Sequence, residues 1–423
     1  MRSFVRLCAV GLAVGSLVAA GCSPDRPEST GTTTTTTVAL GDSFTVTVTG
    51  GSGSGTYRAG STVHVWSSVS TTAGVALPWG GDSALLAEPA EWHTSFVMPS
   101  RDVSLVANSS AQSIPLTVET FAGATSVPKT VRYHFPAAMR GVVVFSHGTG
   151  GNSGFIEGAE SFPIALALVA RSYGVVSTEA EESAAGDLNR DGKERWNTRA
   201  VTANADLGNL EAMFDSFEAR GLIPAGTPKF ALGMSAGGSF SHFLGTVGAT
   251  AVASSYPHLR FDAVVSYCAD ATASRSATTS TTPSAWFMCS AEDNPEVSNA
   301  EARANEATLR GRGIRTDYVE HPPSPLFDER FTRIEGITPS ISAAMAAELR
   351  SAGFVDAAGF ITVDGDQISA TVVANPAAFP TISAQPKIAA VRSQLKTMRA
   401  EHSMYADFTQ RNIDFFERSN PNR

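Results

Sequence analysis

The chain has 423 residues, of which 43% are hydrophobic and 17% are charged, a composition typical of globular proteins rather than disordered ones. Its length is enough for two or three domains with a large buried core. Asp and Glu number 40 against 31 Lys and Arg. The chain therefore has no basic surplus to neutralise phosphates, and we expect no nucleic-acid partner.

The first 21 residues predict an export signal rather than part of the fold. Arg2 and Arg6 form a basic region, and residues 7–20 form an apolar stretch that is short and rich in Gly and Ala for a membrane span. The small residues before Cys22 resemble a bacterial lipobox. The resemblance implies a lipidated Cys22 and a place in the bacterial cell envelope, with the membrane contacted through this anchor only. Secretion after simple cleavage is the alternative.

Two further segments precede the main domain. Residues 22–42 are rich in Ser, Pro and Thr and cannot build a core, so they predict a tether. From 43 to 110 apolar and polar residues alternate, as in 44–48 and 62–66, which predicts a small all-β module. Short motifs between 57 and 107 resemble the small β repeat modules of bacterial surface proteins, including the internalin-type repeats. That resemblance implies a spacer or weak binding module without chemistry.

From 111 to 423, strand-like and helix-like segments alternate, which predicts an α/β domain with a mostly parallel, doubly wound sheet. The expected strands are 141–145, 174–177, 229–232, 261–268, 285–289 and 315–320, and the expected helices include 162–173 and a segment with helical spacing over 207–217. Residues 322–398 read as an insertion, a small subdomain with a helix at 342–350 and a hairpin within 353–365.

The strongest chemical motif is Gly-Met-Ser-Ala-Gly at 233–237, directly after a predicted strand. A nucleophile on a very tight strand-to-helix turn leaves no room for side chains two positions away on either side, which explains Gly233 and Gly237. The N-terminus of the following helix favours developing negative charge. The motif predicts that Ser235 is a nucleophile.

A second glycine-rich motif, Ser-His-Gly-Thr-Gly-Gly, occupies 146–151 at the end of another predicted strand. Its glycines allow the main chain to approach a substrate closely. We expect the backbone N–H groups of Thr149 and Ala236 to form an oxyanion hole. A plain glycine-rich loop is the alternative for either motif taken alone.

The two motifs in this order resemble the α/β-hydrolase family, over about 125–423, and the elbow is similar to the GxSAGG form of secreted depolymerases and feruloyl-esterase-like branches. The resemblance implies a Ser-His-Asp triad in the chain order nucleophile, acid, histidine. It assigns the acid to Asp293, after the strand 285–289, with Glu292 and Asp270 as alternatives.

The histidine of this triad has two candidates. His402 opens the terminal amphipathic segment, and a histidine heading the last helix is the usual arrangement in the family. His321 ends the last predicted strand but abuts two prolines. We prefer His402, and we expect the other candidate to be a partly buried structural histidine, like His242 on the helix after the elbow.

Asp187, Asn189 and Asp191, followed by Gly192, have the spacing of a calcium loop. The position of the usual bidentate acid is Thr198, so a hydrated turn is an equal alternative to structural calcium. Catalysis itself requires no cofactor.

Two cysteines, Cys268 and Cys289, lie at the ends of strands that should be neighbours. An oxidising compartment would permit them to form a disulfide. Two buried thiols are the alternative.

Taken together, these residues predict an exported hydrolase of small or polymeric carboxylic esters that acts through an acyl-enzyme. A peptidase or amidase on the same fold is the first alternative. A catalytically silent, surface-binding lipoprotein is the second.

Overall fold

The structure, a computed structural model, describes residues 41–67, 74–111, 113–250, 253–270, 279–290 and 297–422. Residues 41–423 cluster into one compact unit. The expected export signal, Cys22, nearly all of the expected tether, and the candidate acids Glu292 and Asp293 lie outside the described residues. Within the described ranges, no helix is both long and apolar enough to span a bilayer.

The N-terminal part is an all-β module, as its alternating sequence predicts. Its strands form a four-stranded sheet of order β3-β1-β7-β5 and a three-stranded sheet of order β2-β4-β6. Val63 and Val65 of β4 share a buried core with Phe96 of β6 and Leu105 of β7. The strands are β1 (Ser43–Thr49), β2 (Gly51–Ser52), β3 (Gly55–Arg58), β4 (Thr62–Ser67), β5 (Gly74–Gly81), β6 (His93–Val97) and β7 (Val103–Ala111).

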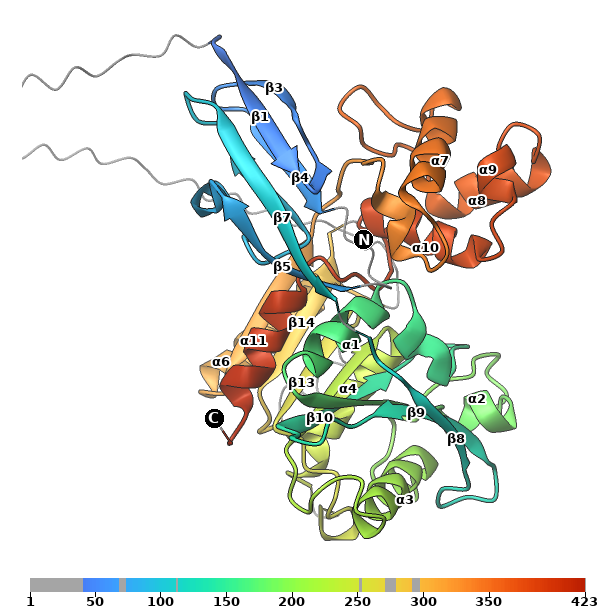
Figure 1. The fold of residues 1–423 in the computed structure, drawn as a ribbon. Helices are drawn as coiled ribbons and strands as arrows, with labels where there is room; N and C mark the ends of the chain where they lie inside the picture. The colour runs from blue at the N-terminus through green and yellow to red at the C-terminus, as the bar shows by residue number, and fades with distance from the viewer. Residues whose placement is uncertain are drawn as a thin grey trace, which may run out of the picture. The chain divides into compact units, whose positions relative to one another are not determined.

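The main domain is built on an eight-stranded sheet of order β15-β14-β13-β12-β10-β11-β9-β8 (Figure 1). β10 to β15 run parallel, whereas β9 is antiparallel to both of its neighbours. The predicted mostly parallel sheet is therefore confirmed. Its strands are β8 (Thr117–Phe121), β9 (Lys129–His134), β10 (Gly141–Ser146), β11 (Tyr173–Ser177), β12 (Lys229–Met234), β13 (Ala263–Tyr267), β14 (Ser284–Cys289) and β15 (Thr316–His321).

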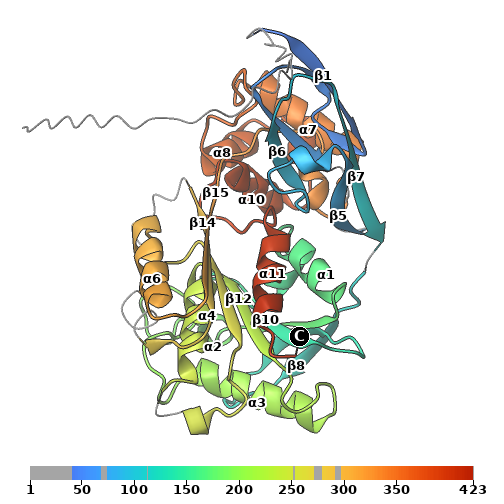
Figure 2. The same ribbon diagram turned by 90° about the vertical axis from the view of Figure 1, so that its left-hand side faces the viewer.

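Helices cover both faces of this sheet, with α1 and α11 on one side and α4 and α6 on the other (Figure 2). β10 is buried along its whole length, and its side chains enter two cores alternately. Val143 and Phe145 pack with α1 and α11, while Val142 and Val144 pack with α3 and α4. These helices, with the short α2, are α1 (Ser161–Val169), α2 (Glu181–Ala185), α3 (Ala205–Ala219), α4 (Ala236–Val247), α6 (Asn299–Gly311) and α11 (Thr409–Ser419).

The insertion is a helical subdomain with a core of its own, which includes Met345, Leu349 and Leu395. Within the predicted hairpin, 353–365, the chain reverses through one antiparallel bridge between Val355 and Ile361. The Thr362 N–H donates to the Phe354 carbonyl and the Asp356 N–H to the Phe360 carbonyl, while the Asp356 carboxylate accepts two backbone N–H groups inside the turn. The elements are η4 (Arg330–Arg333), α7 (Pro339–Ser351), α8 (Gly365–Ala374), α9 (Pro380–Ser383) and α10 (Ile388–Met398).

The β module packs directly against the rest of the unit. The guanidinium of Arg333, from the insertion, lies 3.7 Å from the ring centre of Trp92 and 4.8 Å from that of Trp66. A carboxylate oxygen of Glu91 accepts the backbone N–H of Gln410 at 3.0 Å and so caps the first turn of α11. The β module is therefore packed against the main domain, and the expected role as a spacer or weak binding module stays a prediction.

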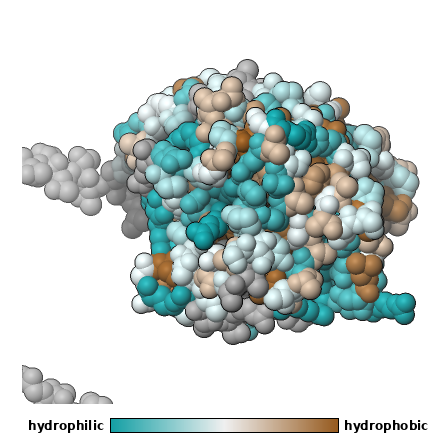
Figure 3. Space-filling view, turned by 90° about the horizontal axis from the view of Figure 1, so that it is seen from below, coloured by the Kyte–Doolittle hydropathy of each residue, from teal (hydrophilic) through white to brown (hydrophobic). Residues whose placement is uncertain are grey.

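The surface carries few large exposed apolar side chains. Val97, Val118, Leu188 and Val373 are the large ones among the described residues, and they come from separate elements. The face seen from below is largely hydrophilic, with its strongly hydrophobic residues in small scattered groups (Figure 3). The described residues of this face therefore form no extended apolar patch.

Candidate active site

Ser235 stands on the turn between β12 and α4, in the middle of the sheet. Its φ of 56° lies in the left-handed region, which non-glycine residues rarely adopt. The Ser235 N–H donates to the Tyr267 carbonyl at 2.9 Å, and its carbonyl accepts the Ser239 N–H at 3.0 Å. The Ser235 hydroxyl makes no capping hydrogen bond to its own helix. The backbone is thus held on both sides while the half-buried hydroxyl stays available.

The two glycines of the motif allow this turn to form. A Cβ atom on Gly233 would lie 2.2 Å from the Gly237 carbonyl oxygen, a contact that real side chains do not make. Gly237 is equally confined by the loop that follows β10. The elbow predicted from the sequence is present.

The second motif lies directly beside the elbow. A Cβ atom built on Gly148 would be 3.4 Å from the Ser235 Cβ. The loop is fixed by hydrogen bonds from Gly150 N–H to the Glu194 carbonyl and from Gly151 N–H to the Gly148 carbonyl. Within the part of the chain that the structure describes, the Thr149 N–H has no hydrogen-bond partner. Ala236 is the first residue of α4, so its N–H has no partner within the helix.

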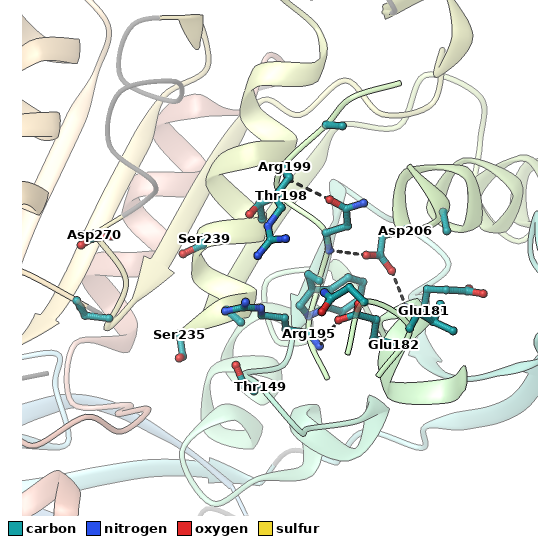
Figure 4. Close-up of a pocket in the computed structure, with 18 residues that line it drawn as sticks. Thr149, Glu181, Glu182, Arg195, Thr198, Arg199, Asp206, Ser235, Ser239 and Asp270 are labelled. Atoms are coloured by element: carbon teal, nitrogen blue, oxygen red, sulfur yellow. Dashed lines mark hydrogen bonds between the residues drawn. The ribbon is translucent and has the colours of Figure 1, made fainter. Parts of the chain in front are cut away.

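Both motifs open into one cavity of about 670 Å³, a size suited to a small ligand (Figure 4). Ser235, Ala236, Thr149 and Asp270 contribute to its lining. The opposite wall comes from the region around α2 and the long connection to α3, including Glu181, Glu182, Arg195, Trp196 and Arg199. The guanidinium of Arg195 points into the space in front of Ser235 (Figure 4).

The sequence interpretation named Asn189 and Thr198 of this wall only as parts of a calcium loop and did not predict that the segment faces Ser235. A long connection without regular structure in a compact domain is often functional, and this was the available signal. Trp196 joins this wall to the glycine-rich loop 146–151, because its indole N–H donates to the His147 carbonyl at 2.9 Å.

His402 lies on the connection between α10 and α11 and is half-buried. The expectation that it heads the last helix is wrong, because α11 begins only at Thr409. Its neighbour Ser403 directs its carbonyl to the Cys268 Sγ at 3.2 Å. Cys268 directly follows Tyr267, the residue that accepts the Ser235 N–H. The connection carrying His402 therefore crosses the same sheet edge as Ser235.

His321 is placed differently. It ends β15, three strands away from β12 in the sheet order, which corresponds to about 14 Å. Its side chain is buried, and its Nε2 lies 2.6 Å from a carboxylate oxygen of Asp407. This imidazole belongs to an internal ion cluster rather than to the lining of the cavity.

Two other histidines are structural. His242 of α4 is fully buried, its Nε2 lies 2.9 Å from the Ser266 hydroxyl, and its ring stacks on Trp286. Burial lowers the pKa of His242 to about 3. His147 accepts the Ala180 N–H at 3.1 Å through its Nε2.

Asp270 is the described candidate for a catalytic acid. It follows β13 and lines the cavity with Ser235. Burial raises the pKa of Asp270 to about 6, and its carboxylate accepts the Ser298 N–H at 3.2 Å. A carboxyl with this pKa remains largely ionised at neutral pH, as a triad acid must, so Asp270 stays a candidate for that role. The placement of Asp293 is outside the described residues.

The two cysteines are buried neighbours at the ends of β13 and β14. The Sγ atoms of Cys268 and Cys289 lie 2.9 Å apart with no bond between them. The disulfide that the sequence allows is thus not formed in this structure, although the thiols are adjacent.

The residues with calcium-loop spacing serve a different purpose. The Asp187 carboxylate accepts the Gly192 N–H at 2.7 Å, and the Asn189 side chain accepts the Asp191 N–H at 2.9 Å. The Asp191 carboxylate pairs with Arg195 at 2.5 Å, so a guanidinium stands where a cation would bind. The described residues contain no group of three or more acidic, His or Cys side chains suited to a metal ion. This loop fits a calcium ion poorly.

No protein-family model matches the sequence, and no curated protein is significantly similar to it. Among solved structures, an esterase from Thermogutta terrifontis is 13% identical and has a TM-score of 0.33, with 48% of this chain and 80% of that chain covered. A Bacillus cereus carboxylesterase is 17% identical, with coverages of 45% and 83% and a TM-score of 0.32. The Pyrococcus horikoshii acylaminoacyl peptidase is 10% identical, with coverages of 55% and 41% and a TM-score of 0.36.

The strand order decides the fold. Numbered from β8, the sheet reads 1-2-4-3-5-6-7-8 with only its second strand antiparallel, and the nucleophile turn follows the fifth. This is the α/β-hydrolase fold. Ser235, Thr149 and the connection that carries His402 lie at the carboxyl edge of this sheet, and of these three residues Ser235 and Thr149 line the cavity.

Proposed function

We propose that this protein is a serine hydrolase of carboxylic esters, with Ser235 as the nucleophile. The observation that carries the proposal is the strained backbone at Ser235, which presents a hydroxyl to a cavity beside the N–H groups of Thr149 and Ala236. A backbone conformation this rare persists only where the surrounding structure enforces it, and functional sites are where such strain gathers.

The proposed reaction begins when His402 takes the proton of the Ser235 hydroxyl, whose oxygen then forms a bond to the ester carbonyl carbon. The two backbone N–H groups bind the resulting oxyanion, an effect worth about 3–4 kcal/mol per donor in studied enzymes. The bond between the carbonyl carbon and the alcohol oxygen then breaks, and His402 donates the proton to that oxygen as the alcohol leaves. Water then attacks the acyl-enzyme by the same steps and releases the acid.

The acid that orients His402 is proposed to be Asp293, with Asp270 as the alternative. Asp293→Asn and Asp270→Asn compare them directly, because an amide keeps the volume of the side chain and removes its charge. We expect Asp293→Asn to reduce kcat by on the order of 10⁴-fold and Asp270→Asn to leave most of the activity. If Asp270→Asn instead caused the larger loss of kcat, Asp270 would be the catalytic acid.

A fluorophosphonate probe and short-chain nitrophenyl esters test the proposed function on the purified full-length protein. We expect labelling and hydrolysis by the wild type and neither by Ser235→Ala. Ser239→Ala is the matched control, since Ser239 lines the same cavity one turn along α4. The proposal would be excluded if Ser235→Ala were still labelled. It would also be excluded if the folded wild type were not labelled and did not hydrolyse the esters.

Matched ester and amide substrates separate an esterase from a peptidase or amidase. We expect the ester to be cleaved and the amide with the same acyl group to be cleaved far more slowly. Small esters and polymeric esters are the partners proposed for the cavity.

We further propose that the protein is exported and anchored in the bacterial cell envelope through a lipidated Cys22. Incorporation of radiolabelled palmitate into the wild type, and its loss in Cys22→Ala, is the expected result. A soluble secreted wild type without label would instead indicate simple cleavage.

A further inference from the structure

A buried ion cluster connects the insertion to the segment that follows His402. Arg333 of η4 is almost completely buried, and its Nη1 donates to a Glu160 carboxylate oxygen at 2.5 Å. Its Nη2 donates to the Asp407 carboxylate. One guanidinium from the insertion therefore bridges a residue preceding α1 and a residue preceding α11.

Glu160 is the centre of this cluster. The oxygen that accepts Arg333 also accepts the backbone N–H of Ala406 at 2.7 Å. Its other oxygen accepts the side-chain amide of Gln394, on α10, at 2.6 Å. Two separate elements of the insertion and the segment after His402 thus meet on one buried carboxylate.

The same segment is also fixed at the sheet edge. Ser403 contacts the Cys268 Sγ through its carbonyl, and the Tyr405 hydroxyl donates to the Met288 carbonyl at 3.0 Å. Contacts therefore occur at 403, 405, 406 and 407, directly after His402, and the backbone on the other side turns at Ala400 with φ 55°. His402 itself is the half-buried residue between these anchors.

We propose that Arg333 is a positioning residue for His402: by bridging Glu160 and Asp407 it holds the segment 403–407 against the sheet, and so keeps the imidazole at the distance that Ser235 requires. The inference rests on the proposed function. It gives the insertion a role in catalysis, because the insertion supplies Arg333 and Gln394 to the cluster.

The chemistry of the cluster makes Arg333 hard to replace. A planar guanidinium can donate to two carboxylates at once, whereas an ammonium is a point charge. Without Arg333, Arg330, at 3.8–3.9 Å from each, would be the remaining arginine near the two buried carboxylates. The segment would then shift to bring the carboxylates toward water, and His402 would move with it.

The test uses Arg333→Gln and Arg333→Lys in the full chain, with kcat and KM measured on a short-chain nitrophenyl ester. We expect Arg333→Gln to lower kcat on the order of 10²-fold, the cost of a displacement near 1 Å, with KM nearly unchanged. Arg333→Lys should recover part of the loss. Arg350→Gln is the control, since Arg350 makes an exposed ion pair within the same insertion and should leave kcat unchanged.

A double-mutant cycle separates positioning from general stability. In a His402→Ala background, Arg333→Gln should cause no further loss of the residual activity. An equal loss in both backgrounds, or wild-type kcat in folded Arg333→Gln, would overturn the inference. If Arg333→Gln fails to fold, Glu160→Gln and Arg333→Lys replace it, and each is combined with His402→Ala in the same double-mutant cycle and judged by the same outcomes. Wild-type hydrolysis and its loss in Ser235→Ala are measured first, so a failure of the proposed function is recognised separately.

Discussion

A Cβ atom on Gly237 would lie 2.0 Å from the carbonyl oxygen of Ser146. The start of α4 therefore packs against the end of β10 at a distance that only glycine permits. Because the loop 147–151 begins directly after Ser146, the contact sets the spacing between Ser235 and the loop that is proposed to bind the oxyanion.

Gly237→Ala should consequently separate the two halves of the site. We expect a loss of about 1–3 kcal/mol in the free energy of unfolding, as for overpacked cores, together with loss of fluorophosphonate labelling. Chemical denaturation and labelling measure the two effects. Gly248→Ala is the control, since Gly248 has φ −62° and open space around its Cβ position. Normal labelling of Gly237→Ala would show that the spacing is not required.

The oxyanion hole predicts a difference between two substitutions at Thr149. Thr149→Ala keeps the backbone N–H and should keep most of kcat. Thr149→Pro removes the N–H and should lower kcat by about 10²–10³-fold, measured on a nitrophenyl ester with circular dichroism to confirm folding. Similar activity in both variants would remove Thr149 from the site.

The two histidines should respond to alanine in opposite ways. His402→Ala should lower kcat by about 10²–10⁴-fold with little change in unfolding. His321→Ala removes the imidazole that contacts Asp407 in a buried cluster and, because Arg333 still pairs with that carboxylate, should cost about 1–3 kcal/mol of stability. Kinetics and urea unfolding on the same samples distinguish them. A stable, inactive His321→Ala with an active His402→Ala would reverse the assignment.

The pH dependence of stability should report His242. Its pKa is about 3 in the folded protein because of burial, against 6.5 unfolded. The unfolded state therefore binds the extra proton first, and the stability present above pH 6.5 is lost as the pH falls toward 3. At pH 4.5 this amounts to about 3 kcal/mol.

His242→Gln tests this by urea unfolding at pH 7.5 and 4.5. The variant should be less stable at pH 7.5, because it loses the stacking on Trp286, but its stability should fall less on acidification. Burial also lowers the pKa of His93 to about 3, and this residue is present in both proteins. Its contribution to the loss of stability on acidification is therefore the same in the wild type and in His242→Gln. An unchanged fall in stability would contradict the prediction.

The adjacent thiols predict dependence on the compartment. Cys268 and Cys289 should stay reduced in protein made in a reducing cytoplasm and form a disulfide after export, by exchange with an oxidised dithiol. Alkylation after unfolding, followed by mass spectrometry, counts the free thiols. Two alkylated cysteines in exported protein would contradict this expectation, and Cys268→Ser provides the reference for a single thiol.

The sequence predicts the sheet and the elbow well because each depends on local patterns. Apolar runs such as 141–145 indicate strands buried on both faces. The glycines at 233 and 237 meet a steric requirement of the turn, and both belong to one five-residue motif. The β module is likewise visible from its alternation.

The remaining parts of the site depend on contacts between distant segments. Arg333 and Arg330 would be expected on the surface, since arginine is seldom fully buried, yet both lie inside an ion cluster. The sequence predicts the start of α11 at His402, but contacts of residues 403–407 with Glu160 and Cys268 hold that segment in a non-helical form. No periodicity reveals such partners.

The indoles of Trp66 and Trp92 beneath the two buried arginines also limit how the protein can be divided. A fragment that starts at 111 would expose these guanidinium groups to water, and α11 would lose its cap from Glu91. We expect such a fragment to be recovered mainly as aggregate, whereas a chain that starts at 41 should be soluble. We therefore expect the N-terminal strands and the eight-stranded sheet to fold as one unit, so that they have to be expressed and engineered together.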